Sequence, residues 1–275
     1  MTLGLLFKGF NPTLSIEEIN LDNLNKFQEY LIGRKLKNRT VRITIARFKV
    51  VFRHYAKQLG LSTEFFSDFV AVKDLGNENI ICLSEEEVEA IASLEKLTPR
   101  QRQVQQQFLF ACETALRHSD IYITQGNIDG DFLHVTMKKV DRKVRIPYTA
   151  TAKAIVAGPY FPFKRIDTSS YDKVLKALCK RLEVFKKPIT VTHYINDIPY
   201  SVVKEKWQLM SSHVARKTAI NRWLDIPISE SVIVQWSGHK TPKMLHEHYQ
   251  HKQAASEREA KKLLAPYPVE SPMSR

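Results

Sequence analysis

Five residues between positions 117 and 249 have side chains suited to attack on a phosphodiester without a metal. They are two arginines, two histidines and a tyrosine: Arg117, His213, Arg216, His239 and Tyr249. This chemistry needs positive charge near the non-bridging oxygens, a nucleophile, and a proton donor for the leaving alkoxide. Arginine meets the first need because it is permanently charged and its planar fork donates to two oxygens at once. A tyrosine can supply the nucleophile.

The spacing of these residues favours their convergence. Arg216 follows His213 by three positions, so on a helix the two side chains share a face. Arg117 comes at the end of an apolar helical pattern, and His239 stands directly before the start of another helix. We therefore expect the arginines and histidines to meet at one phosphate.

Three motifs carry a resemblance to a known family. They read E-T-A-L-R-H-S-D-I over residues 113–121, H-V-A-R over 213–216 and S-G-H over 237–239. In this order they resemble the T-G-L-R-x-S-E-L, H-x-x-R and L-G-H motifs of the tyrosine recombinase (phage integrase) family. The chain departs from the family pattern at three places, where it has Ala115 for glycine, Asp120 for glutamate and Ser237 for leucine.

The resemblance implies a role for each residue. Arg117 and Arg216 clamp the scissile phosphate, and His239 donates a further hydrogen bond. His213 acts as base or proton relay for the nucleophile. In the family the nucleophile usually stands at the ninth position after the L-G-H histidine, with the tenth as a common variant. Here the ninth position is a histidine and the tenth is Tyr249, so Tyr249 is the expected nucleophile.

The family's general acid is a lysine in the β-hairpin that follows the first arginine. Alignment against the following Ile146 and Pro147 places it at Lys139, with the adjacent Lys138 as an alternative. The resemblance implies a 3′-phosphotyrosyl link to double-stranded DNA and four protomers on DNA. It implies no metal and no cofactor.

A metal site is the competing interpretation of the histidines near the C-terminus, which are His239, His246, His248 and His251. No cysteine or acidic cluster accompanies them, as a zinc or other divalent site would need, and the nearby arginines would repel a cation. We therefore predict no bound metal.

A strongly basic stretch precedes these motifs. No acidic residue occurs from Tyr30 to Thr63, and apolar residues recur there every three or four positions. This pattern predicts an amphipathic helix over about 38–59, with a buried apolar stripe and a basic outer face. Seven basic residues are the candidate contacts to a DNA backbone: Lys35, Lys37, Arg39, Arg42, Arg47, Lys49 and Arg53.

Composition limits the partner and the compartment. The 275 residues include 42 Lys and Arg against 29 Asp and Glu, and the net charge of +13 indicates a polyanionic partner. No apolar run approaches the roughly 18 residues of a membrane-spanning helix, and the N-terminus does not resemble a signal peptide. Three widely spaced cysteines argue against a disulfide framework. We expect a cytoplasmic protein, associated with a bacterial nucleoid, that has no contact with membranes.

Helix signals divide the chain into two domains. Helices over 15–33, opened by Ser15 and Glu18, over 38–59 and over about 64–69 predict a helical DNA-binding domain at 1–72. This is one helix fewer than the family usually has, so the domain is expected to be short. Gly and Asn residues without a helical stripe indicate a linker at 73–83. The catalytic domain is expected at 84–275.

The second domain begins with two helix starts, at 84–87 and 98–101. Alternating residues then predict strands at 121–124, 132–137 and 143–147. Helical patterns return around 174–185, 214–220, 232–236 and 241–249, and 187–209 is expected to form an irregular excursion or a loose hairpin. The predicted fold class is mainly α with a small antiparallel sheet (α+β).

These features together predict a site-specific DNA recombinase or integrase. Two other functions use the same residues or the same fold. One is a catalytically silent DNA-binding protein, and the other is a type IB topoisomerase-like enzyme that relaxes supercoils without exchanging partners.

Overall fold

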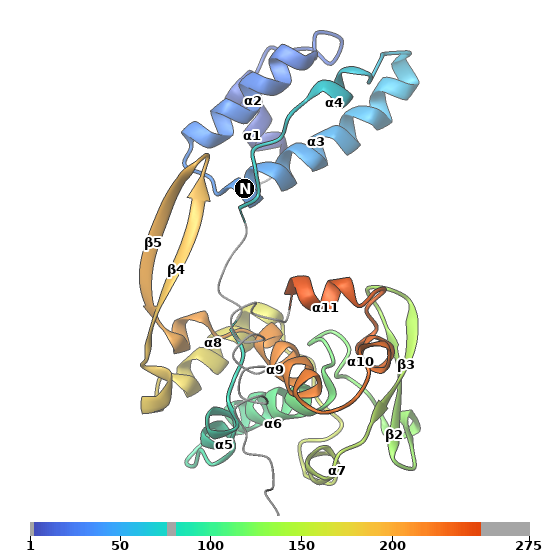
Figure 1. Cartoon of the computed structure of the whole chain (residues 1–275), viewed down its shortest axis with the longest axis vertical. Helices are drawn as coiled ribbons and strands as arrows, with labels where there is room; N and C mark the ends of the chain where they lie inside the picture. Colours follow the sequence, from blue (N-terminus) through green and yellow to red (C-terminus); the bar gives the residue numbers. More distant parts are fainter. Residues whose placement is uncertain (1–2, 76–80, 249–275) are drawn as a thin grey trace, which may run out of the picture. The chain divides into compact units, whose positions relative to one another are not determined.

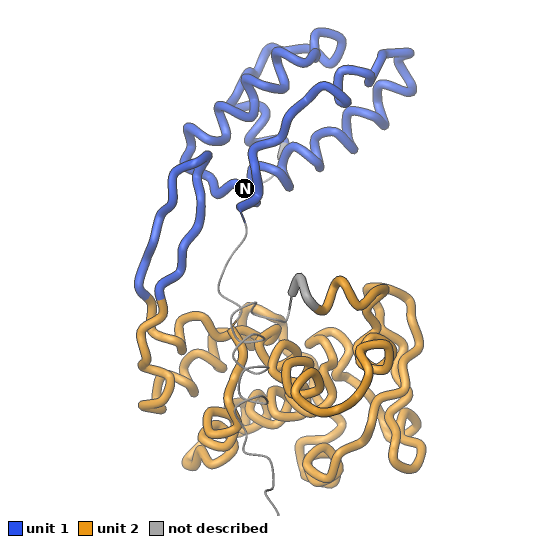
Figure 2. Tube along the Cα trace, viewed as in Figure 1, with its two compact units in different colours: residues 1–78, 190–203 blue, residues 79–189, 204–275 orange. Residues whose placement is uncertain are grey.

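The structure, a computed structural model, describes residues 3–75 and 81–248 (Figure 1). The chain forms two compact units (Figure 2). Unit 1 contains Met1–Glu78 together with Thr190–Val203, and unit 2 contains Asn79–Ile189 and Lys204–Arg275. A segment from the region expected to be catalytic, Thr190–Val203, therefore lies with the N-terminal unit.

Unit 1 contains four helices within its described residues. They are α1 (Leu3–Phe10), α2 (Leu21–Gly33), α3 (Asn38–Leu59) and α4 (Phe65–Asp68). The predicted count of three helices is thus wrong, because α1 is a short, mostly apolar segment with Lys8 as its one charged residue and so gives little helical pattern. The helix expected from Ser15 begins at Leu21 instead. The side chain of Asn20 accepts a hydrogen bond from the Asn23 N–H at 3.0 Å and so caps the new start.

The long helix α3 has the bounds that its periodicity predicts. Its three- and four-residue spacing predicts a buried stripe of Val41, Ile45, Phe48, Phe52, Tyr55 and Leu59, and the first four are buried. Toward the C-terminal end, however, Tyr55 and Leu59 are exposed and Ala56 is buried in their place. The helix ends at Gly60, whose φ of 67° is the left-handed conformation that glycine adopts without a Cβ penalty. An aromatic cluster that includes Phe7, Phe27 and Phe48 holds α1, α2 and α3 together.

The predicted loose hairpin is confirmed as β4 (Pro188–Ile195) paired with β5 (Ile198–Glu205). Its turn contacts the start of α3 through the buried side chain of Asn38. The Asn38 amide donates to the carbonyls of Lys73 at 2.8 Å and of Asn196 at 2.7 Å. A buried amide must be hydrogen-bonded, so this pair of bonds fixes the hairpin turn on the start of α3.

Unit 2 opens with the two predicted helix starts. Capping boxes at Ser84 and Thr98 begin α5 (Glu85–Ala92) and α6 (Pro99–Thr114). The capping residue Glu87 also forms an ion pair with Lys206 at 2.6 Å, and both side chains are largely buried. The ion pair joins α5 to the 3₁₀ helix η3 (Lys206–Leu209), which follows the hairpin in sequence.

Two of the three predicted strands are confirmed in a small antiparallel sheet. Its strands are β1 (Ile128–Asp129), β2 (Phe132–Met137) and β3 (Arg142–Pro147), in the order β1-β2-β3, and Met137 is paired with Arg142. The strand predicted at 121–124 is wrong. There the backbone N–H of Ile123 donates to the carbonyl of Ile121 at 2.9 Å. In a strand this N–H would instead form a hydrogen bond with a neighbouring strand. The 3₁₀ helix η1 (Gln125–Asn127) follows.

The rest of unit 2 is helical. Its remaining helices are α7 (Ala150–Val156), α8 (Thr168–Cys179), α9 (Ser212–Asp225), α10 (Glu230–Ser237) and α11 (Lys243–His248), with the 3₁₀ helix η2 (Glu183–Phe185) after α8. Helix α7 was not predicted, and α8 begins and ends about six residues before the pattern that predicted it. Helix α9 packs on α6, and α10 packs on β3 (Figure 1).

The predicted fold class, mainly α with small antiparallel sheets, is confirmed. Among the described helices, none has the length and apolar character needed to cross a membrane.

Candidate active site and nucleic-acid interface

Arg117 follows the end of α6 after a tight left-handed residue. Ala115 caps α6 with a φ of 53°, a conformation that costs an L-residue roughly 1 kcal/mol or more and that explains glycine at the equivalent place in the motif it resembles. The Arg117 guanidinium lies 3.8 Å from the buried carboxylate of Asp120 and 3.3 Å from Met137 Sδ on β2. Arg117 is therefore oriented both by its own turn and by the sheet.

Arg216 is the largest fully buried side chain of the protein's described part. Its guanidinium donates to the carbonyl of Ala115 at 2.6 Å and to that of Ser237 at 2.7 Å, and it lies 3.3 Å from His239 Nε2. Two of these partners are carbonyls at the ends of helices α6 and α10. Arg216 thus joins the two motifs that contain Arg117 and His239.

His239 is held by its motif neighbours. Its Nδ1 lies 2.7 Å from the Ser237 hydroxyl, and its backbone carbonyl accepts a hydrogen bond from Arg142 at 2.6 Å. Gly238 between them has a φ of 67°. A Cβ at Gly238 would lie 2.5 Å from Met137 Sδ, so both the conformation and the close approach of the sheet require glycine.

The turn between β2 and β3 contains both lysines proposed as the general acid. Lys138 and Lys139 are exposed there, and Asp141 at the end of the turn has a φ of 45°. The N–H of Lys138 donates to Asp120 Oδ1 at 3.3 Å. Asp120 therefore binds the lysine turn and contacts Arg117, while Arg142 at the base of the same turn binds the carbonyl of His239.

His213, at the start of α9, lies among positive charges. The residue is exposed as a whole, yet partial burial of the imidazole lowers the pKa of His213 to about 4. The charges of Arg216, Lys217, Arg117 and Lys139 contribute to this lowering, in that order. His213 is consequently neutral at neutral pH and can accept a proton. Lys139 is among the groups that act on it.

The lowered pKa of His213 predicts a pH-dependent stability. Below its ordinary pKa of 6.5 the imidazole is protonated in the unfolded chain but stays neutral in the folded protein until about pH 4. The unfolded state therefore binds more protons in this window, and the free energy of unfolding falls as the pH drops from 6.5 toward 4. Urea denaturation at several pH values measures this slope, and His213→Gln is expected to make it shallower. An identical slope in both proteins would contradict the lowered pKa.

The structure brings Arg117, Lys139, His213, Arg216 and His239 to one region of unit 2. The sixth predicted catalytic residue, Tyr249, follows α11 in sequence and lies outside the described residues. Within residues 3–75 and 81–248, no three His, Cys, Asp or Glu side chains are grouped to hold a metal ion. Sequence reasoning missed Arg142 because the contact between its guanidinium and the His239 carbonyl spans 97 positions of the chain.

The seven basic candidates of unit 1 occupy different environments. Lys35, Lys37, Arg39 and Arg47 are exposed. Lys49 points back toward α4, where its ammonium donates to the Phe66 carbonyl at 3.1 Å and lies over the Phe69 ring; burial, and then the charge of Arg53, lower the pKa of Lys49.

Two further candidates also contact their own unit. Arg42 donates to the carbonyl of Val72 at 3.0 Å, and the Arg53 guanidinium lies 5.1 Å from the centre of the Phe66 ring. Both side chains are nevertheless exposed, so only Lys49 of the seven candidates is partly buried and the other six are open to a polyanion.

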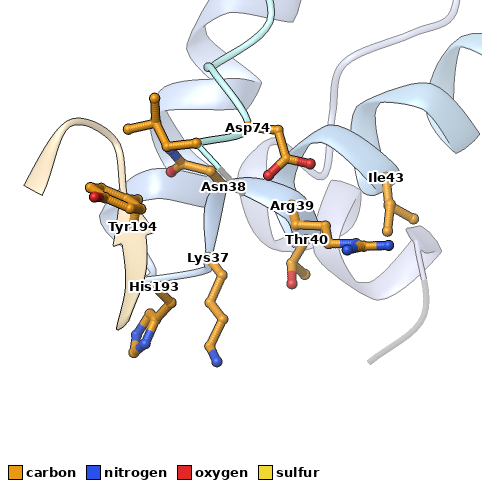
Figure 3. A pocket seen from close by; sticks show the side chains of 9 residues that line it. Lys37, Asn38, Arg39, Thr40, Ile43, Asp74, His193 and Tyr194 are labelled. Atoms are coloured by element: carbon orange, nitrogen blue, oxygen red, sulfur yellow. The ribbon is translucent and has the colours of Figure 1, made fainter. Parts of the chain in front are cut away.

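A small cavity of about 150 Å³ lies at the N-terminal end of α3 (Figure 3). Lys37, which precedes α3, and Arg39 and Thr40 of α3 line it. Asp74 and the hairpin residue His193 complete this part of the lining. In Figure 3 the side chains of Lys37 and His193 extend in the same direction. Nothing in the sequence pattern connects His193 with α3, because only the docked hairpin brings them together.

Comparison with known proteins gives one family match and several structural matches. The model of the phage integrase SAM-like domain family matches residues 5–69. No curated protein sequence matches the chain.

The structure of the Tn1549 transposon integrase in complex with transposon right end DNA is similar, with a TM-score of 0.67 and 14% identity, over 96% of this chain and 91% of that chain. A lambda integrase dimer bound to a COC′ core site gives a TM-score of 0.67 at 13% identity. The match covers 91% of this chain and 86% of that chain. A lambda integrase tetramer bound to a Holliday junction gives a TM-score of 0.62 at 13% identity. The match covers 90% of this chain and 70% of that chain. At these identities the likeness establishes a shared fold over nearly the whole chain.

Proposed function

We propose that this chain, which has the fold of the tyrosine recombinases, is a site-specific DNA recombinase that cleaves and rejoins DNA through a 3′-phosphotyrosyl intermediate. The observation that carries the proposal is the arrangement around Arg216. This buried guanidinium joins the turn before Arg117 to the turn before His239, and His213 lies one helical turn before it on α9. Five side chains suited to one phosphate are thus positioned by four separate elements.

Arg117 and Arg216 bind the non-bridging oxygens of the scissile phosphate in this proposal, and His239 adds a hydrogen bond. Positive groups fixed before the reaction stabilise the charge that develops in the transition state without reorganising. Asp120, Met137 and Arg142 are positioning residues, because they act through Arg117, the lysine turn and His239.

Tyr249 Oη then attacks the phosphorus and forms the phosphotyrosyl bond as the bond from phosphorus to the 5′ oxygen breaks. A phenol has a pKa near 10 and needs a base at neutral pH. The lowered pKa of His213 leaves its imidazole neutral and able to take that proton. Lys139 protonates the departing 5′ oxygen. Attack by a 5′-hydroxyl of another strand reverses each step, so the bond energy is retained and no ATP is consumed.

The partner is double-stranded DNA, bound by the basic surface of unit 1, and the active assembly is a homotetramer on DNA. The lambda integrase tetramer on a Holliday junction supports that assembly by its shared fold. We place the protein in the bacterial cytoplasm, at the nucleoid, where its substrate lies.

Recombination between two copies of the target site tests the proposal. The purified protein is mixed in EDTA with a supercoiled plasmid that contains two copies of the DNA that flanks the gene of this chain. The expected products are an SDS-resistant protein–DNA adduct and recombined circles of predicted length. Tight binding without an adduct would support the silent DNA-binding protein, and an adduct with relaxed but unrecombined circles would support the topoisomerase-like enzyme.

A further inference from the structure

Helix α3 has an outer face that mixes exposed apolar and basic side chains. We define this outer face of α3 as Arg39, Ile43, Ala46, Arg47 and Val50, which recur at three- and four-residue spacing on the side opposite the buried stripe. Ile43 is 45% exposed and Val50 is 65% exposed. Single exposed apolar residues are ordinary, but these lie in line along one helix with an arginine beside each.

The apolar members form one continuous surface. Ile43, Ala46 and Val50 line a shallow hollow together with Val51 and the stem of Arg47. Their side chains are short, and valine and isoleucine are stiff at χ1, so they present fixed methyl groups close to the helix axis. Such a surface suits a partner that offers isolated methyl groups to an approaching helix.

The electrostatics of the same face select the partner. No acidic residue occurs from Tyr30 to Thr63, so the helix and its flanks are uniformly positive or neutral. Ile43 also lines the cavity that contains Lys37, Arg39 and one acidic residue, Asp74 (Figure 3), so the apolar surface is continuous with two candidate phosphate contacts. A polyanion whose interior offers methyl groups matches this combination better than an apolar protein surface does.

We propose that the outer face of α3 enters the major groove and recognises thymine C5-methyl groups. The major groove is about 12 Å wide and admits an α-helix, and the thymine methyl is the apolar group that it presents to side chains. At 1.5 Å per residue, the 22 residues of α3 form a rod of about 33 Å. Arg39 and Arg47 bind phosphates or guanine edges beside the methyl contacts. This inference rests on the proposed DNA-binding function and specifies its substrate: a half-site that contains at least two thymines.

Replacement of thymine by uracil tests the proposal, because it removes only the methyl group. The full-length protein first selects its preferred duplexes from a random pool. Each thymine of a selected half-site is then replaced by uracil, and the affinity is measured. We expect about fourfold weaker binding for each methyl group lost from the contacted positions.

The double variant Ile43→Ala with Val50→Ala connects the effect to this face. It should bind thymine-containing duplexes more weakly and lose the preference for thymine over uracil. Both residues are exposed and alanine favours helices, so the fold is retained. The matched control is Val203→Ala, since Val203 is equally exposed at 65% but lies on β5. It should keep the preference. Arg39→Gln should weaken both duplexes equally and reduce the salt dependence.

Three outcomes would overturn the proposal. Equal affinity of the wild type for thymine and uracil duplexes would exclude methyl recognition while leaving the recombinase function intact. A change of oligomeric state in the double variant, with the thymine preference retained, would identify the face as a protein interface. Failure to bind any duplex would overturn this proposal and the proposed function together.

Discussion

Replacement of Tyr249 by phenylalanine is expected to abolish the covalent protein–DNA adduct. Phenylalanine keeps the ring but has no hydroxyl to attack phosphorus, so cleavage should fall by at least about 10⁴-fold. DNA binding should be unchanged, because the basic surface of unit 1 and the arginines of unit 2 are intact. SDS–polyacrylamide gels of reactions with labelled target DNA measure the adduct, and gel shifts measure the binding.

A matched control removes a different phenol. Tyr160→Phe deletes the same single oxygen from unit 2, in the segment between α7 and α8, and should cleave at the wild-type rate. An adduct that persists in Tyr249→Phe would move the nucleophile to another residue. Mapping the labelled peptide would then identify that residue directly.

Replacement of Lys139 by alanine is the second large expected effect. Loss of a positioned general acid should slow cleavage by roughly 10² to 10⁴-fold, because the 5′ alkoxide would leave without a proton. A substrate with sulfur in place of the bridging 5′ oxygen should restore the rate, since a thiolate leaves without protonation. If the sulfur substrate restores the cleavage rate of Lys139→Ala, the variant has lost the general acid. If the variant had lost phosphate binding instead, the sulfur substrate would not restore the rate.

The neighbouring lysine provides the control for this experiment. Lys138→Ala removes the same charge from the same turn, but the backbone N–H of Lys138 still binds Asp120. Its rate should stay near that of the wild type. If Lys138→Ala shows the loss and the rescue by sulfur, Lys138 is the general acid. The charge of Lys139 acts on His213, so Lys139 lies on the same side of the turn as the proposed base.

Several elements could be predicted because their signals lie within a few residues of one another. The capping boxes at Ser84 and Thr98 begin α5 and α6 where a side chain binds a backbone N–H three positions away. The period of α3 and the alternation of β2 and β3 are equally local. Helix α1 was not predicted and the segment at 121–124 was wrongly predicted as a strand, because apolar residues alone do not distinguish a helix, a strand and a buried turn.

The resemblance to the tyrosine recombinases came from motifs and is confirmed by the fold. The motifs name candidate residues, but they do not show how those residues are held. Arg216 reaches a carbonyl 101 positions away and another 21 positions away. Such contacts depend on how α6, α9 and α10 pack, which no short-range pattern encodes.

The amino-acid sequence by itself determined the helix caps, the periodicities, the basic character of α3 and the identity of the candidate catalytic residues. The caps, the periodicities and the basic character follow from backbone hydrogen bonding, side-chain spacing or charge over a few positions. The candidate catalytic residues follow from the resemblance of short motifs to those of the tyrosine recombinases. Only the tertiary structure decided that the hairpin turn at Asn196 joins Asn38, that Lys49 turns inward, and that Arg142 holds His239. Those contacts join groups brought together by core packing, and packing depends on the whole chain at once.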